Sequence, residues 1–226
     1  MNHKIILTGA TGMVGEGVLL ECLAHPHVAE VLSVSRRPCG RVHPKLKEYI
    51  VPDFLTLKED DPALKGYDAC FFCAGVTSIG KKEDEYTRLT YTTTLHFAKV
   101  LANQNPEMTF VYVSGAGTDS SEKGRSMWAR VKGKTENDLQ KLSFKRVHNF
   151  RSGFMKLSAG QKNALPAYKY VGWLFPFLKV VMPNGVSTLE QVGKAMINTL
   201  IIGSDKQVLE VKDINRLGDG LIGNQL

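Results

Sequence analysis

The chain has 226 residues, 43% of them hydrophobic and 23% charged, a balance typical of a globular protein with a packed core. It contains no apolar run of about 18 residues, which excludes a transmembrane helix, and its first residues do not form a signal peptide, so we expect a cytoplasmic protein. The formal charge of +7 suits an anionic ligand, and no nucleic-acid-binding motif accompanies it.

The expected strands alternate with helices along the first 155 residues. Apolar runs predict strands over 3–7, 28–35, 49–51, 67–73, 109–113 and 146–150. One helix is expected from about Met13 to Ala24. A second follows the stripe Tyr86, Leu89, Thr93, Phe97, Val100 and Leu101, and a third follows Trp128, Val131, Thr135, Leu139 and Leu142. This alternation predicts an α/β fold of the Rossmann type, with a doubly wound parallel sheet forming a single domain.

Residues 156–226 are expected to form a short C-terminal extension on the substrate side of that domain. The segment Ser187–Glu190 predicts a capping box that opens a helix to about Leu200, and 208–211 predicts a last strand. Residues 168–177 are aromatic and basic. We expect them to form a packed lid or a homodimer contact, with a membrane surface or another partner chain as the alternative.

The cysteines and histidines predict neither a metal site nor a disulfide framework. Cys70 and Cys73 have CxxC spacing, but they fall in an apolar run that indicates a strand. Residues three apart on a strand point to opposite faces, so these two thiols cannot share a ligand.

The segment Thr8–Gly15 has the features of a phosphate-binding turn, because it joins the first strand to the first helix and carries glycines at GxxGxxG spacing. Gly9 permits a tight turn, Gly12 lets the backbone approach a pyrophosphate, and Gly15 lets helix and strand pack closely. Backbone N–H groups at the helix start then hold the anion. The residues expected to contact the cofactor here are Gly9, Thr11, Gly12, Met13, Val14 and Gly15.

The end of the second strand favours NADP(H) over NAD(H). An acidic residue at this position would bind the ribose diol of NAD, but Arg36 and Arg37 stand there instead. A guanidinium group is suited to the additional 2′-phosphate of NADP. Further along, Asp53 and Phe54 are expected beside the adenine. Cys73, Ala74 and Gly75 are expected where the cofactor approaches the backbone.

These residues together resemble the short-chain dehydrogenase/reductase superfamily, specifically its atypical, epimerase-like branch. The segments that carry the resemblance are Thr8–Gly15, Cys73–Gly75, Val113–Gly115, Val131–Lys134, Phe150–Gly153 and Leu189–Ala195. Within the branch, the chain is similar to the small proteins related to the human Tat-interacting oxidoreductase. The resemblance covers about residues 3–200 and is more specific for fold and cofactor than for substrate.

The resemblance implies a catalytic Ser, Tyr and Lys, of which this chain has only two. Ser114 matches the serine that polarises a substrate carbonyl, and Lys132 matches the lysine that binds the nicotinamide ribose. The tyrosine is expected four residues before the lysine, one helical turn away, but that position holds Trp128. An indole N–H donates a hydrogen bond but is not a usable acid or base near neutral pH.

Three interpretations of Trp128 stay open. In the first, Tyr112 or a water chain held by Ser114 and Lys132 supplies the proton. In the second, the hydride acceptor needs little acid catalysis, such as a quinone or flavin. In the third, the protein binds NADP(H) without catalysis, as a sensor or scaffold. If there is a substrate, we expect a small molecule, an apolar carbonyl or a quinone. A sugar-nucleotide epimerase is less favoured, because it also needs the tyrosine. About 70 residues after the sixth strand also leave little room for a sugar-binding domain.

Overall fold

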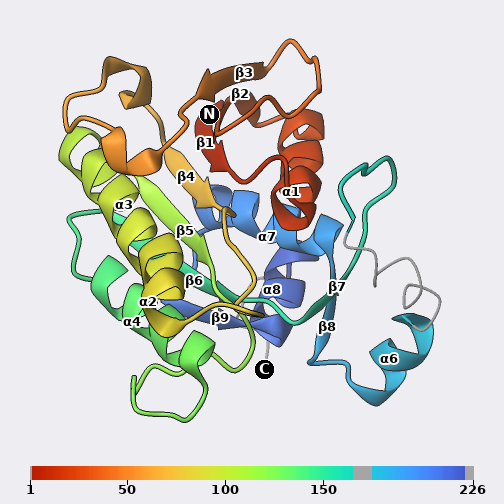
Figure 1. The fold of residues 1–226 in the computed structure, drawn as a ribbon. Helices are drawn as coiled ribbons and strands as arrows, with labels where there is room; N and C mark the ends of the chain where they lie inside the picture. Colours follow the sequence, from red (N-terminus) through yellow and green to blue (C-terminus); the bar gives the residue numbers. More distant parts are fainter. Residues whose placement is uncertain (1, 165–174, 222–226) are drawn as a thin grey trace.

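A seven-stranded parallel sheet forms the centre of the computed structural model, which describes residues 2–164 and 175–221 (Figure 1). The strands stand in the order β3-β2-β1-β4-β5-β6-β9. They comprise β1 His3–Thr8, β2 Val28–Ser35, β3 Leu46–Ile50, β4 Ala69–Phe72, β5 Thr109–Val113, β6 Arg146–Arg151 and β9 Val208–Glu210. The chain runs from the central β1 to one edge and then returns to fill the other, which confirms the predicted doubly wound Rossmann sheet.

Helices cover both faces of this sheet (Figure 1). On one face lie α1 Met13–Ala24, α7 Leu189–Ile201 and α8 Val211–Gly218. On the other lie α2 Glu83–Thr87, α3 Thr93–Gln104 and α4 Met127–Leu139, with the short 3-10 turns η1 Phe54–Thr56 and η2 Pro62–Leu64. The central strands are apolar on both sides for this reason. In β1, Ile5 and Leu7 pack toward α1 and α7, whereas Ile6 packs toward α3.

The element boundaries agree with the sequence prediction best where apolar residues mark both ends. The bounds of α1, β2 and β5 are as predicted. The predicted third strand at 49–51 is wrong in its start, because β3 begins at Leu46. Its residues Lys47 and Glu48 are exposed at the sheet edge and give no apolar signal. The fourth strand is shorter than predicted, since the Tyr67 N–H donates to the Asn105 side chain (3.3 Å) before the strand begins.

The helix after β4 contains a π turn over Arg88–Thr92 that joins α2 to α3. A π turn inserts one extra residue, so the buried face shifts along the sequence. The predicted stripe is therefore wrong at Leu89, which is exposed, whereas Thr90 and Thr94 are buried. The third predicted helix ends at Leu139, so Leu142 lies beyond it.

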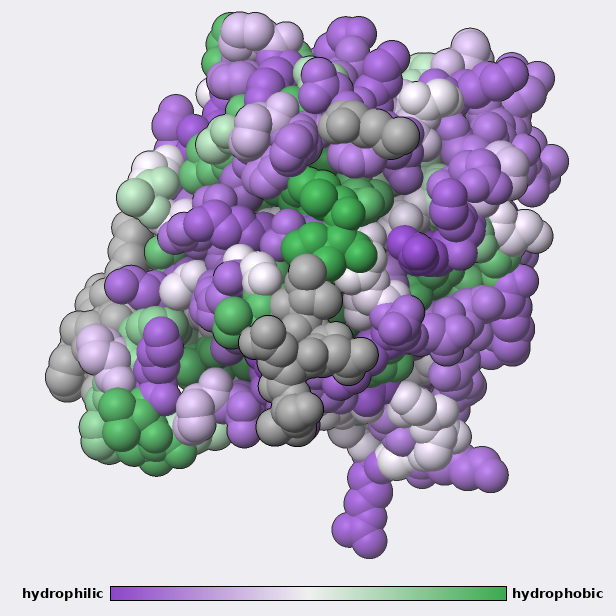
Figure 2. Space-filling model, turned by 180° about the vertical axis from the view of Figure 1, so that it is seen from behind, coloured by the Kyte–Doolittle hydropathy of each residue, from purple (hydrophilic) through white to green (hydrophobic). Residues whose placement is uncertain are grey.

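The last third of the chain divides between the main sheet and a smaller unit. β7 Phe154–Lys156 and β8 Val186–Thr188 pair as a second, two-stranded parallel sheet, and α6 Phe175–Val181 lies beside them (Figure 1). Residues 156–226, expected as an extension on the domain, thus also supply α7, β9 and α8 to the main fold. Tyr168, Tyr170 and Trp173 of the aromatic stretch lie outside the described residues. Exposed apolar side chains gather on and just after α6, at the lower left of Figure 2: Phe177, Val180, Val181 and Met182.

The capping box of α7 begins one residue later than predicted. Thr188 is the N-cap, its hydroxyl accepting from the Gln191 N–H (3.0 Å), while the Gln191 side chain accepts from the Thr188 N–H (3.0 Å). The box is thus Thr188–Gln191 rather than Ser187–Glu190. Ser187 is buried in β8, and its hydroxyl has no partner among the described residues.

We expect Thr188→Ala to lower the free energy of unfolding by about 1 kcal/mol, because the first turn of α7 loses its cap. The matched control is Ser187→Ala, which removes a buried hydroxyl without a partner and should leave stability unchanged or raise it. Urea unfolding followed by circular dichroism measures both. A larger loss for Ser187→Ala than for Thr188→Ala would contradict this assignment of the cap.

Candidate functional site

The turn between β1 and α1 packs tightly against the segment that follows β4. Gly9 has φ +75°, and a Cβ atom there would lie 2.7 Å from the backbone of Cys73 and Ala74. The Ala74 N–H donates to the Thr8 hydroxyl (3.1 Å). A Cβ atom on Gly15 would lie only 2.1 Å from the Gly9 carbonyl oxygen. The glycines at 9 and 15 are therefore required by packing alone.

Gly12 differs from Gly9 and Gly15 because it has space around it. It is the exposed N-cap of α1, and no side chain caps the helix there. Its own N–H donates to the Gly9 carbonyl (2.8 Å), and a Cβ atom would lie 3.4 Å from that oxygen, ordinary contact distance. The N–H groups of the first helical turn, from Met13 onward, thus have no capping side chain. Together with the helix dipole they favour an anion at this end of α1.

The residues predicted for the adenosine half lie after β2 and β3. Arg36 and Arg37 are exposed, and the loop that carries them is held by the Ser35 hydroxyl, which donates to the Arg37 carbonyl (2.7 Å). The Asp53 carboxylate caps η1 by accepting from the Leu55 N–H (3.0 Å). Phe54 is buried, its ring stacked on Phe97 with the centroids 5.1 Å apart. Phe54 serves the core, and its contact with adenine stays a prediction.

Ser114 and Lys132 lie together at the carboxyl end of β5. Ser114 is buried, and its hydroxyl donates to the Phe150 carbonyl (3.3 Å). The Lys132 ammonium, from α4, donates to the Ser114 carbonyl (2.5 Å). Burial lowers the pKa of Lys132 to about 8. The lysine can therefore be charged or neutral within the ordinary working range of an enzyme.

Trp128 lies on the same face of α4, one turn before Lys132, against the loop that follows Ser114. A Cβ atom on either Gly115 or Gly117 would lie 3.7 Å from its six-membered ring. Gly117 has φ +86°, a conformation that favours glycine. The indole is half-buried and forms an apolar wall beside Ser114.

Tyr112 is a core residue. It is fully buried in the core under α3, with its ring 6.2 Å from that of Phe72, and burial raises the pKa of its phenol further above the ordinary value. This placement argues against Tyr112 as the missing proton donor. Cys70 and Cys73 pack into opposite cores, as predicted from their spacing. Within the described residues, no group of three or more metal-ligating side chains gathers.

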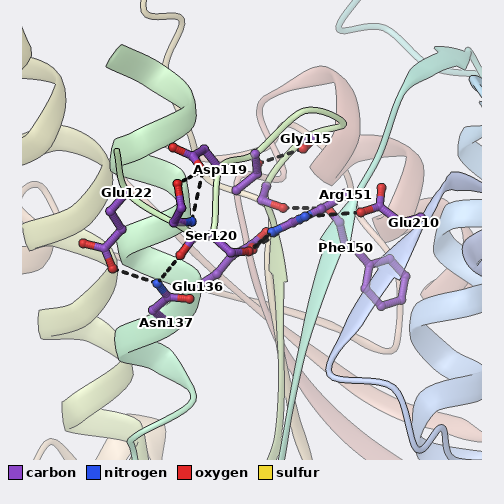
Figure 3. Close-up of polar contacts among 12 residues, drawn as sticks. Gly115, Asp119, Ser120, Glu122, Glu136, Asn137, Phe150, Arg151 and Glu210 are labelled. Carbon is purple, nitrogen blue, oxygen red and sulfur yellow. Dashed lines mark hydrogen bonds and ion pairs between the residues drawn. The ribbon is translucent and has the colours of Figure 1, made fainter. Parts of the chain in front are cut away.

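Arg151 at the end of β6 joins several segments near the site, a role that sequence reasoning did not assign (Figure 3). Its guanidinium binds the buried Glu136 carboxylate of α4 (2.6 Å), Glu210 at the end of β9 (3.3 Å) and the Ser120 hydroxyl (2.5 Å). Asn137 donates to the Ser120 carbonyl (3.0 Å) and so holds the same loop. The network fixes α4, and with it Lys132 and Trp128, relative to the sheet. Only the fold brings these separate residues together, so no sequence motif could reveal it.

Comparison with known proteins agrees with this geometry, although no family model matches the chain. Protein HTATIP2 of Rattus norvegicus is 28% identical over the whole chain and 93% of the rat protein. Protein fmp52-1, mitochondrial, of Aspergillus oryzae is 30% identical over 69% of the chain and 66% of the fungal protein. The chain belongs to the atypical, epimerase-like family of short-chain dehydrogenases/reductases.

Solved structures share the fold of this family member. MoeE5, in complex with UDP-glucuronic acid and NAD, superposes with a TM-score of 0.66 at 16% identity, over 97% of the chain and 82% of MoeE5. The Bordetella bronchiseptica enzyme WbmF, in complex with NAD⁺, gives 0.62 at 16% identity, over 100% and 80%. At such identities the likeness shows the fold alone. No helix in the part of the chain that the structure describes is long and apolar enough to cross a membrane.

The glycines predict two different mutational effects. Gly15→Ala should lower the free energy of unfolding by more than about 2 kcal/mol, because its Cβ would collide with the Gly9 carbonyl. Gly12→Ala should cost less than about 1 kcal/mol, since only the N-cap changes, yet it places a methyl group where a pyrophosphate would approach. Thermal unfolding of the two variants measures the difference. Equal losses of stability would contradict the conclusion that packing requires a glycine at position 15 but not at position 12.

Proposed function

We propose that this protein binds a nicotinamide dinucleotide, NADP(H) in preference to NAD(H), across the carboxyl edge of its sheet. The observation that carries the proposal is the uncapped start of α1, where the exposed Gly12 leaves backbone N–H groups open to a pyrophosphate. Gly9 packs this turn on Cys73 and Ala74 and so supports a continuous floor for the dinucleotide. Relatives of the same fold, MoeE5 and WbmF, are described in complex with NAD or NAD⁺.

The preference for NADP(H) rests on the loop after β2. Arg36 and Arg37 are exposed, and neither has a side-chain hydrogen bond or ion pair to another described residue. The segment from Ser33 to Arg37 contains no carboxylate that would bind a ribose diol or repel a phosphate. Two free guanidinium groups here support recognition of the 2′-phosphate.

Parallel calorimetric titrations with NADPH and NADH test this proposal. We expect NADPH to bind at least about tenfold more tightly, since a charge-assisted phosphate contact distinguishes it. The double variant Arg36→Ala/Arg37→Ala should remove the difference and leave NADH binding unchanged. Arg216→Ala, in α8 on a different part of the fold, is the matched control. Binding of neither dinucleotide would mean that the glycine turn serves only the fold.

We further propose an oxidoreductase activity on a small acceptor whose reduced form is a stabilised anion, a quinone or flavin rather than a simple ketone. When bound, NADPH supplies a hydride from its nicotinamide ring. Trp128 stands where a proton donor is expected and supplies none. Delocalised acceptors tolerate this loss best, because negative charge spread over a ring system needs little general-acid assistance. The indole wall also suits a flat, apolar ring.

Ser114 and Lys132 have separate roles in this proposal. The Ser114 hydroxyl orients the acceptor oxygen. One Lys132 N–H is used on the Ser114 carbonyl, which leaves two donors and a positive charge for the nicotinamide ribose and the developing anion. The Arg151 network holds α4 in place while these groups act.

The charge on Lys132 predicts opposite pH effects on activity and stability. Hydride transfer should fall as pH rises through about 8, because the ammonium loses its proton. Stability should rise over the same range: the folded pKa lies below the unfolded value of about 10.4, so between these values the unfolded state binds more protons. Rate–pH profiles and unfolding at several pH values measure both. Lys132→Arg should abolish the inflection in rate, whereas Lys134→Arg, a surface control on the same helix, should keep it.

The alternative is a protein that senses NADP(H) without turnover and changes its partner or oligomeric state, for instance by forming a homodimer. Trp128 favours this account as well, since it occupies the position where the family's tyrosine would act as the acid. A Trp128→Tyr variant that gains carbonyl reduction supports the enzyme. Tight binding without turnover in either form, together with a change in sedimentation on adding NADPH, supports the sensor. A cytoplasmic location stays a prediction.

A further inference from the structure

The carboxylate of Glu16 is buried in the first turn of α1, directly after the glycine turn. Only 1% of this residue is exposed. A carboxylate that is removed from water needs charged or hydrogen-bonding partners, and Glu16 has three. They come from two segments that are distant in sequence from α1 and from each other.

The first partner is Arg41, in the loop after β2. Its guanidinium binds the Glu16 carboxylate through Nε (3.2 Å) and Nη2. Arg41 lies four residues after Arg37, in the loop that carries the two exposed arginines. The ion pair therefore ties that loop to the phosphate turn.

The other partners are backbone N–H groups of residues 158–163, which we call the strap. The N–H groups of Lys162 (3.0 Å) and Asn163 (2.6 Å) donate to Glu16. Two further bonds close the contact: Gln161 Nε2 donates to the Met13 carbonyl (2.8 Å), and Arg41 donates to the Gly160 carbonyl (2.7 Å). The strap thus lies beside the start of α1, as Figure 1 shows for the loop after β7.

Glu16 is negatively charged in this arrangement. Burial by itself raises the pKa of Glu16, but the hydrogen bonds from Arg41, Asn163 and Lys162 bring it below the ordinary value. A negative charge so near a pyrophosphate site would repel the ligand if it stood alone. The charge of Arg41 and the two N–H groups offset this repulsion. The same contacts keep α1, the loop after β2 and the strap joined.

We propose that Glu16 is a positioning residue for NADP(H): it assembles the dinucleotide site by holding the arginine loop and the strap against the phosphate turn. The inference rests on the proposed function and adds the element that fixes its selectivity. Arg36 and Arg37 can discriminate the 2′-phosphate only if their loop keeps its place. The strap limits the release of the dinucleotide from the edge beside Met13.

The decisive variant is Glu16→Gln, which keeps the shape and one acceptor but removes the charge that holds Arg41. Glu190→Gln is the matched control, since it breaks an exposed ion pair with Lys194 on α7. For Glu16→Gln we expect NADPH to dissociate about tenfold faster and the NADPH/NADH affinity ratio to fall by a similar factor. Without cofactor, hydrogen exchange of the Lys162 and Asn163 amides should also accelerate. Stopped-flow fluorescence, calorimetry and mass spectrometry measure the three effects.

The outcomes separate this inference from the proposed function. If the wild-type protein binds neither dinucleotide, both fail together. If it binds NADPH selectively and Glu16→Gln leaves the ratio and the release rate unchanged, Glu16 serves only the fold and the inference alone is overturned. Should Glu16→Gln not fold, Arg41→Gln removes the same ion pair from its less buried partner. If that variant keeps the wild-type ratio of NADPH affinity to NADH affinity, the inference is also overturned.

Discussion

The close contact between the glycine turn and its neighbours is the constraint on which the other features depend. The Gly15 Cα and the Gly9 carbonyl approach so closely that no side chain fits between them, and Gly9 in turn packs on Cys73 and Ala74. This contact sets α1 against β1 and β4, the middle strands of the sheet. It also directs the uncapped end of α1 toward the carboxyl edge, where the other loops converge.

Charge at that edge is arranged around the same helix. Glu16 sits in the first turn of α1, a position that the helix dipole favours for an acid but that competes with an anionic ligand. Arg41 and the N–H groups of the strap surround the carboxylate and offset its negative charge. Arg36 and Arg37, which have no such partner among the described residues, remain open to solvent. One arginine of the loop therefore supports structure, while two are available for a ligand.

The other half of the candidate site has Trp128 where the resemblance implies a tyrosine, but the position of its helix is fixed. Arg151 and Glu136 form a buried ion pair that fixes α4 against β6, and α4 presents both Lys132 and Trp128. Removing either partner would leave an uncompensated buried charge, so both are needed to keep α4 in its place. The activity that we propose at this position depends on the lowered pKa of Lys132 and on the shape of the indole wall.

The sequence by itself determined the fold class, the glycine turn between β1 and α1, and the bounds of α1, β2 and β5, because these depend on local signals: apolar runs, glycine spacing and helix starts. Resemblance also singled out Ser114 and Lys132, which the structure places in contact and whose catalytic role stays a prediction. Strand periodicity predicted the opposed Cys70 and Cys73. Only the tertiary structure decided the π turn that shifts the buried face to Thr90 and Thr94, the burial of Phe54 and Tyr112, and the partners of Glu16 and Arg151. Those features arise from contacts between residues up to about 150 positions apart, and no local pattern encodes such distances.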